Sequence, residues 1–137
     1  MANIRVRNVS GLGIFRTDMA IAAMARPDEA RVIANVIVDS GSEYTWIPRP
    51  MLEELGVGVE RIERFQTADG DILEREIGGA FVRVAGRGTP TVVVFAEPGD
   101  LTLLGALAIE GMNLRVDLIE KRLVPAGPVP VAAARAA

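Results

Sequence analysis

The sequence predicts a single, mainly β domain whose sheet closes on itself like a barrel, with one or two short helices. Strand-like segments recur roughly every ten residues and are separated by turn-forming residues. The two helical patterns are short, and each follows the end of a strand-like segment. A length of 137 residues suits one domain with a single core.

The first half of the predicted domain opens with a hairpin. Residues 14–25 are apolar enough for a strand or a helix, and a turn follows around Pro27. Residues 32–38, VIANVIV, predict a buried strand because they are rich in β-branched residues. Residues 49–57, RPMLEELGV, predict a short helix that ends at Gly56.

The second half returns to β structure. Residues 64–76 predict a hairpin with Asp69-Gly70 at its turn, and residues 89–96 predict a second buried strand. The segment LTLLG, residues 101–105, ends a strand at its glycine, and a short helix capped by Gly111 follows. Residues 114–125 predict a closing hairpin.

The missing residue types restrict the chemistry that this chain can perform. The sequence has no cysteine and no histidine, which excludes thiolate nucleophiles, the Ser-His-Asp triad and most transition-metal sites. Lys121, the only lysine, lies in a charged turn where a solvated side chain is expected. If the protein is an enzyme, carboxylates carry its chemistry.

Charge and hydropathy argue against two classes of partner. The net charge is -3 and the arginines are scattered, so we expect no nucleic-acid binding. No apolar run approaches the ~20 residues that span a bilayer, and the N-terminus lacks the apolar stretch of a signal peptide. We therefore expect a cytoplasmic protein that does not bind membranes.

The stretch ANVIVDSGSEYTWIP, residues 34–48, runs from the predicted strand straight into Asp39, Ser40 and Gly41. This order resembles the catalytic loop of the aspartic proteases, whose signature is Asp-Thr/Ser-Gly. ADGD at 68–71 stands where that family has its flap hairpin. LTLLG, with the short helix after it, resembles the element that passes under the active-site loop. The spacing is similar to that of the single-domain, retropepsin-like proteases of retroviruses and some bacteria.

The resemblance covers residues 14–125 and implies the acid-protease, or retropepsin, fold for that range. Residues 1–13 are then an N-terminal lead-in and residues 126–137 a low-complexity Pro/Ala tail. The resemblance further implies that Asp39, Ser40 and Gly41 form the catalytic loop. It assigns Ala68, Asp69 and Gly70 to a substrate-binding flap.

The activity that the resemblance implies is that of an aspartic endopeptidase acting on a peptide or protein, with no metal or organic cofactor. In the mechanism of that family, two neighbouring carboxylates share one proton. The sequence contains one Asp-Ser-Gly, so the second carboxylate is expected to be Asp39 of another copy in a homodimer. Tyr44 and Trp46 alternate along a strand and are expected to serve core or dimer packing.

Two other functions remain open from the sequence. One is a catalytically inactive dimer of the same fold that binds peptides or partner proteins, because a fold does not determine a function. The other is a carboxylate hydrolase such as a glycosidase, with both acids in one chain. The second alternative predicts an active monomer, and the protease hypothesis predicts an inactive one.

Overall fold

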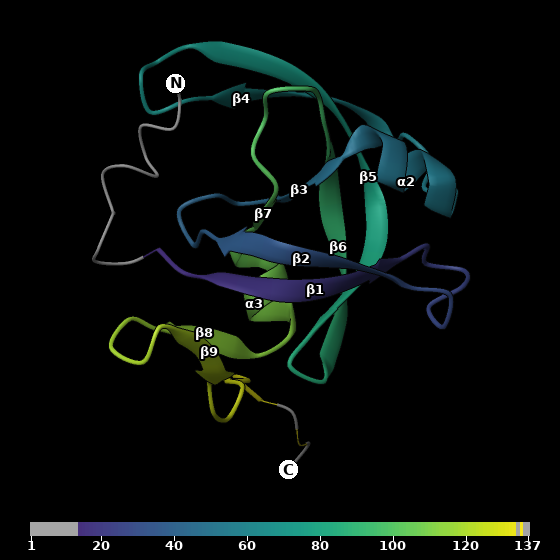
Figure 1. Ribbon diagram of the computed structural model, residues 1–137. Helices are drawn as coiled ribbons and strands as arrows, with labels where there is room; N and C mark the ends of the chain where they lie inside the picture. The colour runs from purple at the N-terminus through teal and green to yellow at the C-terminus, as the bar shows by residue number, and fades with distance from the viewer. Residues whose placement is uncertain (1–13, 134, 136–137) are drawn as a thin grey trace.

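The computed structural model describes residues 14–133 and residue 135, so the predicted lead-in of residues 1–13 lies outside the described residues. A seven-stranded sheet dominates the fold, in the order β1-β2-β7-β3-β6-β5-β4 (Figure 1). β1 also pairs with β5, which closes six of these strands into a ring. The strands are β1 (Arg16–Ala22), β2 (Arg31–Val38), β3 (Thr45–Pro48), β4 (Arg61–Gln66), β5 (Ile72–Val84), β6 (Arg87–Ala96) and β7 (Leu103–Leu104).

The two-residue strand β7 is inserted between β2 and β3. It pairs in parallel with β2 through Ile37 and Val38, and antiparallel with β3 through Trp46. The chain therefore leaves the sheet at the end of β2, loops past the end of β7, and re-enters as β3 on its other side. The loop of residues 39–44 is thus anchored on both sides by the sheet.

β5 extends beyond the ring and forms a projecting hairpin with β4. Its first half pairs with β4 over six residue pairs, and its second half pairs with β6 and β1. The strand passes close to the preceding segment at Gly78, where an added Cβ would lie 2.2 Å from the carbonyl oxygen of Gly58. The predicted hairpin around Asp69-Gly70 is confirmed, and it arches over the end of the ring (Figure 1).

Two short helices lie among the described residues, α2 (Arg49–Leu55) and α3 (Ala106–Gly111). Gly56 ends α2 in the left-handed conformation (φ 79°), as predicted. The predicted cap at Gly111 is wrong: Gly111 lies inside α3, the cap is Met112, and Asn113 takes the left-handed conformation. Gly111 is instead required by packing, because a Cβ there would lie 2.5 Å from Thr89 Oγ1.

No helix in the described part of the chain has the length and apolar character needed to cross a bilayer.

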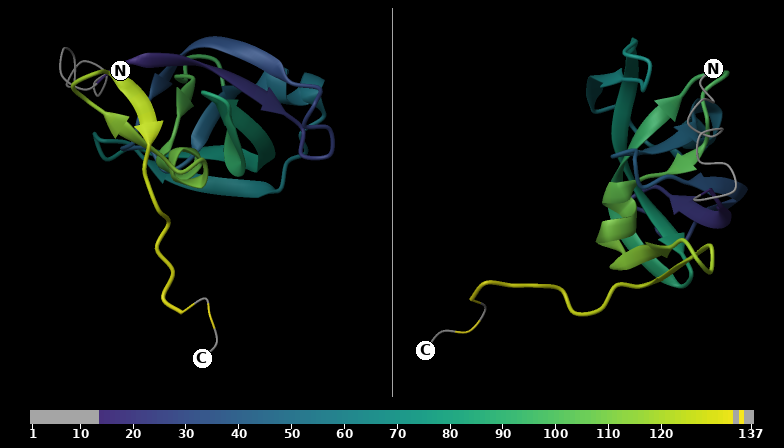
Figure 2. Two further views of the ribbon diagram at one scale, coloured as in Figure 1. Left: turned by 90° about the horizontal axis from the view of Figure 1, so that it is seen from below. Right: turned by 90° about the vertical axis from the view of Figure 1, so that its left-hand side faces the viewer.

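The C-terminal part forms a separate two-stranded sheet below the ring. Strands β8 (Leu114–Asp117) and β9 (Arg122–Pro125) pair antiparallel, which confirms the predicted closing hairpin. Residues 126–133 form no helix or strand, are exposed, and run away from the body of the molecule (Figure 2). The start of this tail is held by Asn113, whose Nδ2 donates to the carbonyl of Gly127 at 2.7 Å.

The hydrophobic core fills the inside of the ring and is completed by the two helices. Its largest buried side chains include Phe95, Met19 and Ile47. The prediction of a buried strand at 32–38 holds only for its second half: Val36, Ile37 and Val38 are buried, whereas Val32 is 68% exposed. The reason is topological, since only the end of β2 is covered by a further strand, β7, at its edge.

Candidate active site

The loop after β2 is held in place by main-chain hydrogen bonds around Asp39. The amide of Asp39 donates to the carbonyl of Leu104 at 2.9 Å. Its carboxylate accepts from the amide of Gly41 at 3.0 Å, and its carbonyl accepts from the amide of Ser42 at 3.1 Å. The carboxylate therefore sits at a defined position at the end of the strand, half-buried.

The second part of the loop is tied to the start of α3. The first amides of this helix have no partner within the helix. Here Ala106 donates to the carbonyl of Ser42 at 2.7 Å, and Leu107 donates to the carbonyl of Glu43 at 3.0 Å. These two hydrogen bonds satisfy amides at the start of the helix and also position the loop.

Gly105 and Thr45 make this close approach possible. An added Cβ at Gly105 would lie 2.3 Å from the carbonyl oxygen of Tyr44, so only glycine fits. The amide of Gly105 donates to Thr45 Oγ1 at 3.0 Å, and Thr45 is fully buried. The hydroxyl therefore satisfies a donor that would otherwise be buried without a partner.

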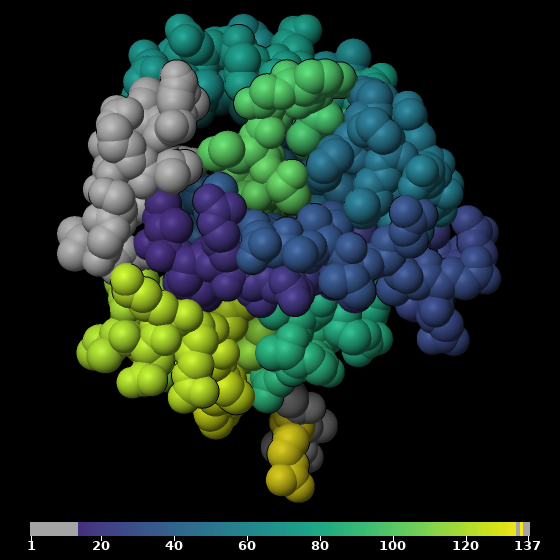
Figure 3. All heavy atoms as spheres, viewed as in Figure 1, coloured from purple at the N-terminus to yellow at the C-terminus, as the bar shows by residue number. Residues whose placement is uncertain are grey.

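A pocket of about 560 Å³ lies between this loop, the β4–β5 hairpin and the segment before β7. The space-filling view shows the surface hollowed between the hairpin and that segment (Figure 3). Asp39 and Gly41 line the pocket from the loop, and Ala68 and Asp69 line it from the hairpin turn. The fold therefore brings together the two predicted site segments, which lie about thirty residues apart in the sequence. Ser40 and Gly70 stand beside these residues in the chain but do not line the pocket.

One wall of the pocket is aromatic. Phe65 of β4 contacts both Tyr44 and Trp46 edge-on, with ring centroids 6.0 and 5.1 Å apart. Tyr44 and Trp46 are half-buried and line the pocket, so they are not enclosed in the core, and their role in dimer packing stays a prediction. Leu73, which faces Phe65 in the hairpin register, continues the apolar wall.

The charged side chains that line the pocket in the described part of the chain are all acidic: Asp39, Glu43, Asp69 and Asp100. Asp100 forms a two-pronged ion pair with Arg75 of β5, at 2.7 and 2.9 Å, and also accepts from the amide of Glu97. Burial by itself raises the pKa of Asp100. The hydrogen bonds from Arg75 and Glu97, with the positive charge of Arg75, outweigh burial and hold that pKa below its usual value.

Sequence reasoning missed Glu43, Phe65 and Asp100 as parts of the site. No sequence motif surrounds Asp100, and its position depends on an ion pair with a residue 25 positions earlier. For Phe65 a signal existed, because alternation in the predicted hairpin places it on one face with its partner Leu73. Within the described residues, no group of three or more acidic, histidine or cysteine side chains could hold a metal ion.

Comparison with known proteins identifies the architecture. The sequence matches no protein-family model and no curated protein sequence. The structure superimposes on the solution structure of the Simian Foamy Virus (mac) protease with a TM-score of 0.50 and 19% sequence identity. The match covers 70% of this chain and 92% of the viral protein.

The chain has the retropepsin fold. This confirms the predicted fold class, a mainly β single-domain architecture with two short helices among the described residues. An identity of 19% shows the fold alone, so the chemistry has to be argued from the residues of the pocket. Within the retropepsin fold of this chain, the Asp39 carboxylate lies at a defined position in the pocket that the projecting hairpin also lines.

Proposed function

We propose that the protein is an aspartic endopeptidase whose active site is completed by a second copy of the chain. The observation that carries the proposal is the placement of Asp39. Its loop is held by hydrogen bonds to Leu104 and, at Ser42 and Glu43, to the first turn of α3. The carboxylate faces a pocket of about 560 Å³, beneath a hairpin, in a chain with the retropepsin fold.

The proposed reaction uses the two Asp39 carboxylates of a two-fold dimer, which share one proton because both cannot ionise at close range. The ionised carboxylate removes a proton from a water molecule, whose oxygen attacks the peptide carbonyl carbon. The protonated carboxylate gives its proton to the carbonyl oxygen. When the C–N bond breaks, the departing nitrogen takes up the proton that the first carboxylate removed from water, and one hydroxyl of the tetrahedral intermediate returns its proton to the second carboxylate. The products are a carboxylic acid and an amine, and the dyad again holds one proton.

The remaining pocket residues have supporting roles in this proposal. Gly41 allows a close approach of the backbone, and the Ser40 hydroxyl is proposed to bond across to the partner's loop. The turn of Ala68, Asp69 and Gly70 is proposed to act as the flap. An extended peptide would then bind as a strand between the hairpin and the floor of the pocket.

The test is cleavage of an unbiased peptide mixture by the wild type and by Asp39→Asn, read by mass spectrometry between about pH 3.5 and 7, where a coupled dyad titrates. We expect cuts with the wild type and a loss of at least about a thousandfold with the variant, because the dyad then lacks its base. Asp28→Asn, an exposed carboxylate in the turn between β1 and β2, is the matched control and should cleave normally.

The same experiment separates the proposal from a binding module. The aromatic wall of Tyr44, Trp46 and Phe65 suits peptide binding with or without catalysis. If a folded, dimeric wild type makes no cuts, or if Asp39→Asn cuts as well as the wild type, the endopeptidase proposal is wrong. Binding of peptides without cleavage would then identify the protein as an inactive relative of the fold.

A further inference from the structure

The rim of the pocket carries negative charge on two opposite sides. Glu43 lies on the loop that leads from Asp39 to β3, and Asp69 lies at the turn of the β4–β5 hairpin. Both side chains belong to exposed residues, so neither carboxylate is enclosed by the protein. A peptide lying between the loop and the hairpin would pass close to both of them.

The other two carboxylates that line the pocket, Asp100 and Asp39, contribute less negative charge to its rim. Asp100 is neutralised by its two hydrogen bonds from Arg75. Asp39 belongs to the proposed dyad, in which two carboxylates share one proton. Glu43 and Asp69 are therefore the carboxylates left to interact with the flanks of a bound peptide.

No arginine or lysine of the described residues lines the pocket to balance these charges. The pocket between the two carboxylates is lined in large part by apolar side chains, among them Trp46, Phe65, Leu73 and Leu103. Such a site favours a ligand with an apolar centre and positively charged flanks, because unlike charges attract and like charges repel across the rim.

We propose that Glu43 and Asp69 are specificity-determining residues, which select peptides with basic side chains flanking a large apolar segment and reject acidic ones. This inference rests on the proposed endopeptidase function, since it names the substrate class of that site. Both carboxylates are exposed, so the preference is moderate and weakens as salt screens the charges.

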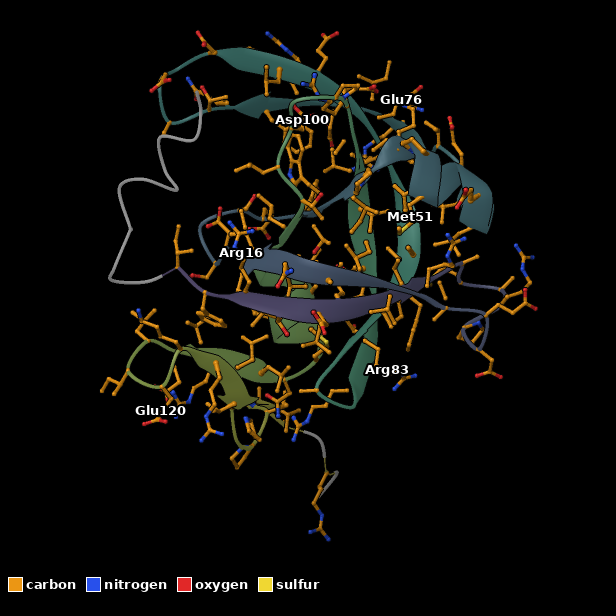
Figure 4. All side chains as sticks on the ribbon, in the orientation of Figure 1. Arg16, Met51, Glu76, Arg83, Asp100 and Glu120 are labelled. Carbon is orange, nitrogen blue, oxygen red and sulfur yellow. The ribbon has the colours of Figure 1, made fainter. Side chains whose placement is uncertain are left out.

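The experiment compares three synthetic peptides that share one leucine- and phenylalanine-rich core. The core is flanked on both sides by arginine, glutamine or glutamate. kcat/KM is measured for each peptide at low and at high salt, with wild type, Glu43→Gln, Asp69→Asn and the double variant. Glu120→Gln is the control, because it removes one negative charge from an exposed residue at the far end of the molecule from Asp100 (Figure 4).

For the wild type we expect kcat/KM about tenfold higher for the arginine peptide than for the glutamate peptide at low salt, a ratio that falls at high salt. Each single variant should lower the ratio by about threefold, and the double variant should bring it near one. Glu120→Gln should keep the wild-type ratio. Equal cleavage of all three peptides by the wild type, or a ratio that survives the double substitution, would overturn the inference and leave the endopeptidase proposal intact.

If no peptide is cut, equilibrium binding decides the inference independently of catalysis. Fluorescence anisotropy with the same three peptides, labelled, is measured on Asp39→Asn protein with and without the two rim substitutions. Tighter binding of the arginine peptide that is lost in the rim variants supports the inference even though the endopeptidase proposal has failed. Binding that does not depend on peptide charge, or no binding of any of the three peptides, contradicts it.

Discussion

At the scale of single residues, Gly105 allows the loop after β2 to pack against the start of α3. The carbonyls of Ser42 and Tyr44 both pass within 3 Å of the place where its side chain would be, at 2.8 and 2.3 Å. These are rigid main-chain atoms that cannot turn aside as a flexible side chain can. The residue is thus explained by close packing, and its backbone has no left-handed angle that would require glycine (φ −100°).

Gly105→Ala is expected to destabilise the fold by about 2–3 kcal/mol, because the added methyl must displace the loop or α3. The loop shift should also lower peptide cleavage more than stability alone explains. Urea unfolding measures the first effect and kcat/KM the second. Gly79→Ala, in β5 with open space around its Cβ, is the control and should change stability by less than about 1 kcal/mol. Equal stability of Gly105→Ala and wild type would show that the loop tolerates the contact.

At the scale of elements, the pair of Arg75 and Asp100 joins the projecting hairpin to the segment before β7. Arg75 lies on β5, and Asp100 lies after the turn that ends β6. The side chains are only 18% and 13% exposed, and two parallel hydrogen bonds connect them. Because both segments line the pocket, this pair holds two of its walls at a set separation.

Asp100→Asn is expected to lower the unfolding free energy by about 2 kcal/mol at pH 7, since it leaves Arg75 without its carboxylate. In the folded state the pKa of Asp100 lies below the ordinary aspartate value of 3.8. Its ionised form therefore adds stability above that value, and the contribution is lost as pH falls through the lowered pKa.

The difference in unfolding free energy between wild type and Asp100→Asn should accordingly have its full size near neutral pH and shrink below about pH 4. Urea unfolding at a series of pH values measures it. Glu110→Gln, an exposed carboxylate, is the control and should show little difference at any pH. A difference that stays constant down to about pH 2 would mean that ionisation of Asp100 does not contribute to stability.

At the scale of the whole molecule, one chain supplies one loop of the Asp-Ser-Gly type, at one end of the ring. The proposed chemistry needs two carboxylates within hydrogen-bond reach, and the described residues place only Asp39 in such a loop. Asp100, the other half-buried carboxylate of the pocket, is held by Arg75 and is not available as its partner. A two-fold dimer meets this need because each Asp39 would then face its own counterpart.

If the proposal is right, activity is expected to fall more steeply than in proportion when the protein is diluted through the concentrations at which a dimer dissociates. An excess of Asp39→Asn protein should also suppress the wild type, because mixed dimers hold one intact carboxylate. Initial rates against total concentration, with and without the variant, measure both effects, and bovine serum albumin in place of the variant is the control. Rates proportional to wild-type concentration, unaffected by the variant, would point to an active monomer with both acids in one chain.

The sequence was enough to predict the β hairpins, the short helices and the position of Asp39-Ser40-Gly41 at a strand end. These features depend on turn residues and hydrophobic periodicity, which act over a few neighbouring residues. It did not reveal that Phe65 meets Trp46, that Asp100 is held by Arg75, that Gly111 packs on Thr89, or that half of β2 is exposed. Each of these depends on segments far apart in the chain. They follow from the tertiary arrangement of the strands, because local sequence patterns do not specify which distant segments come into contact.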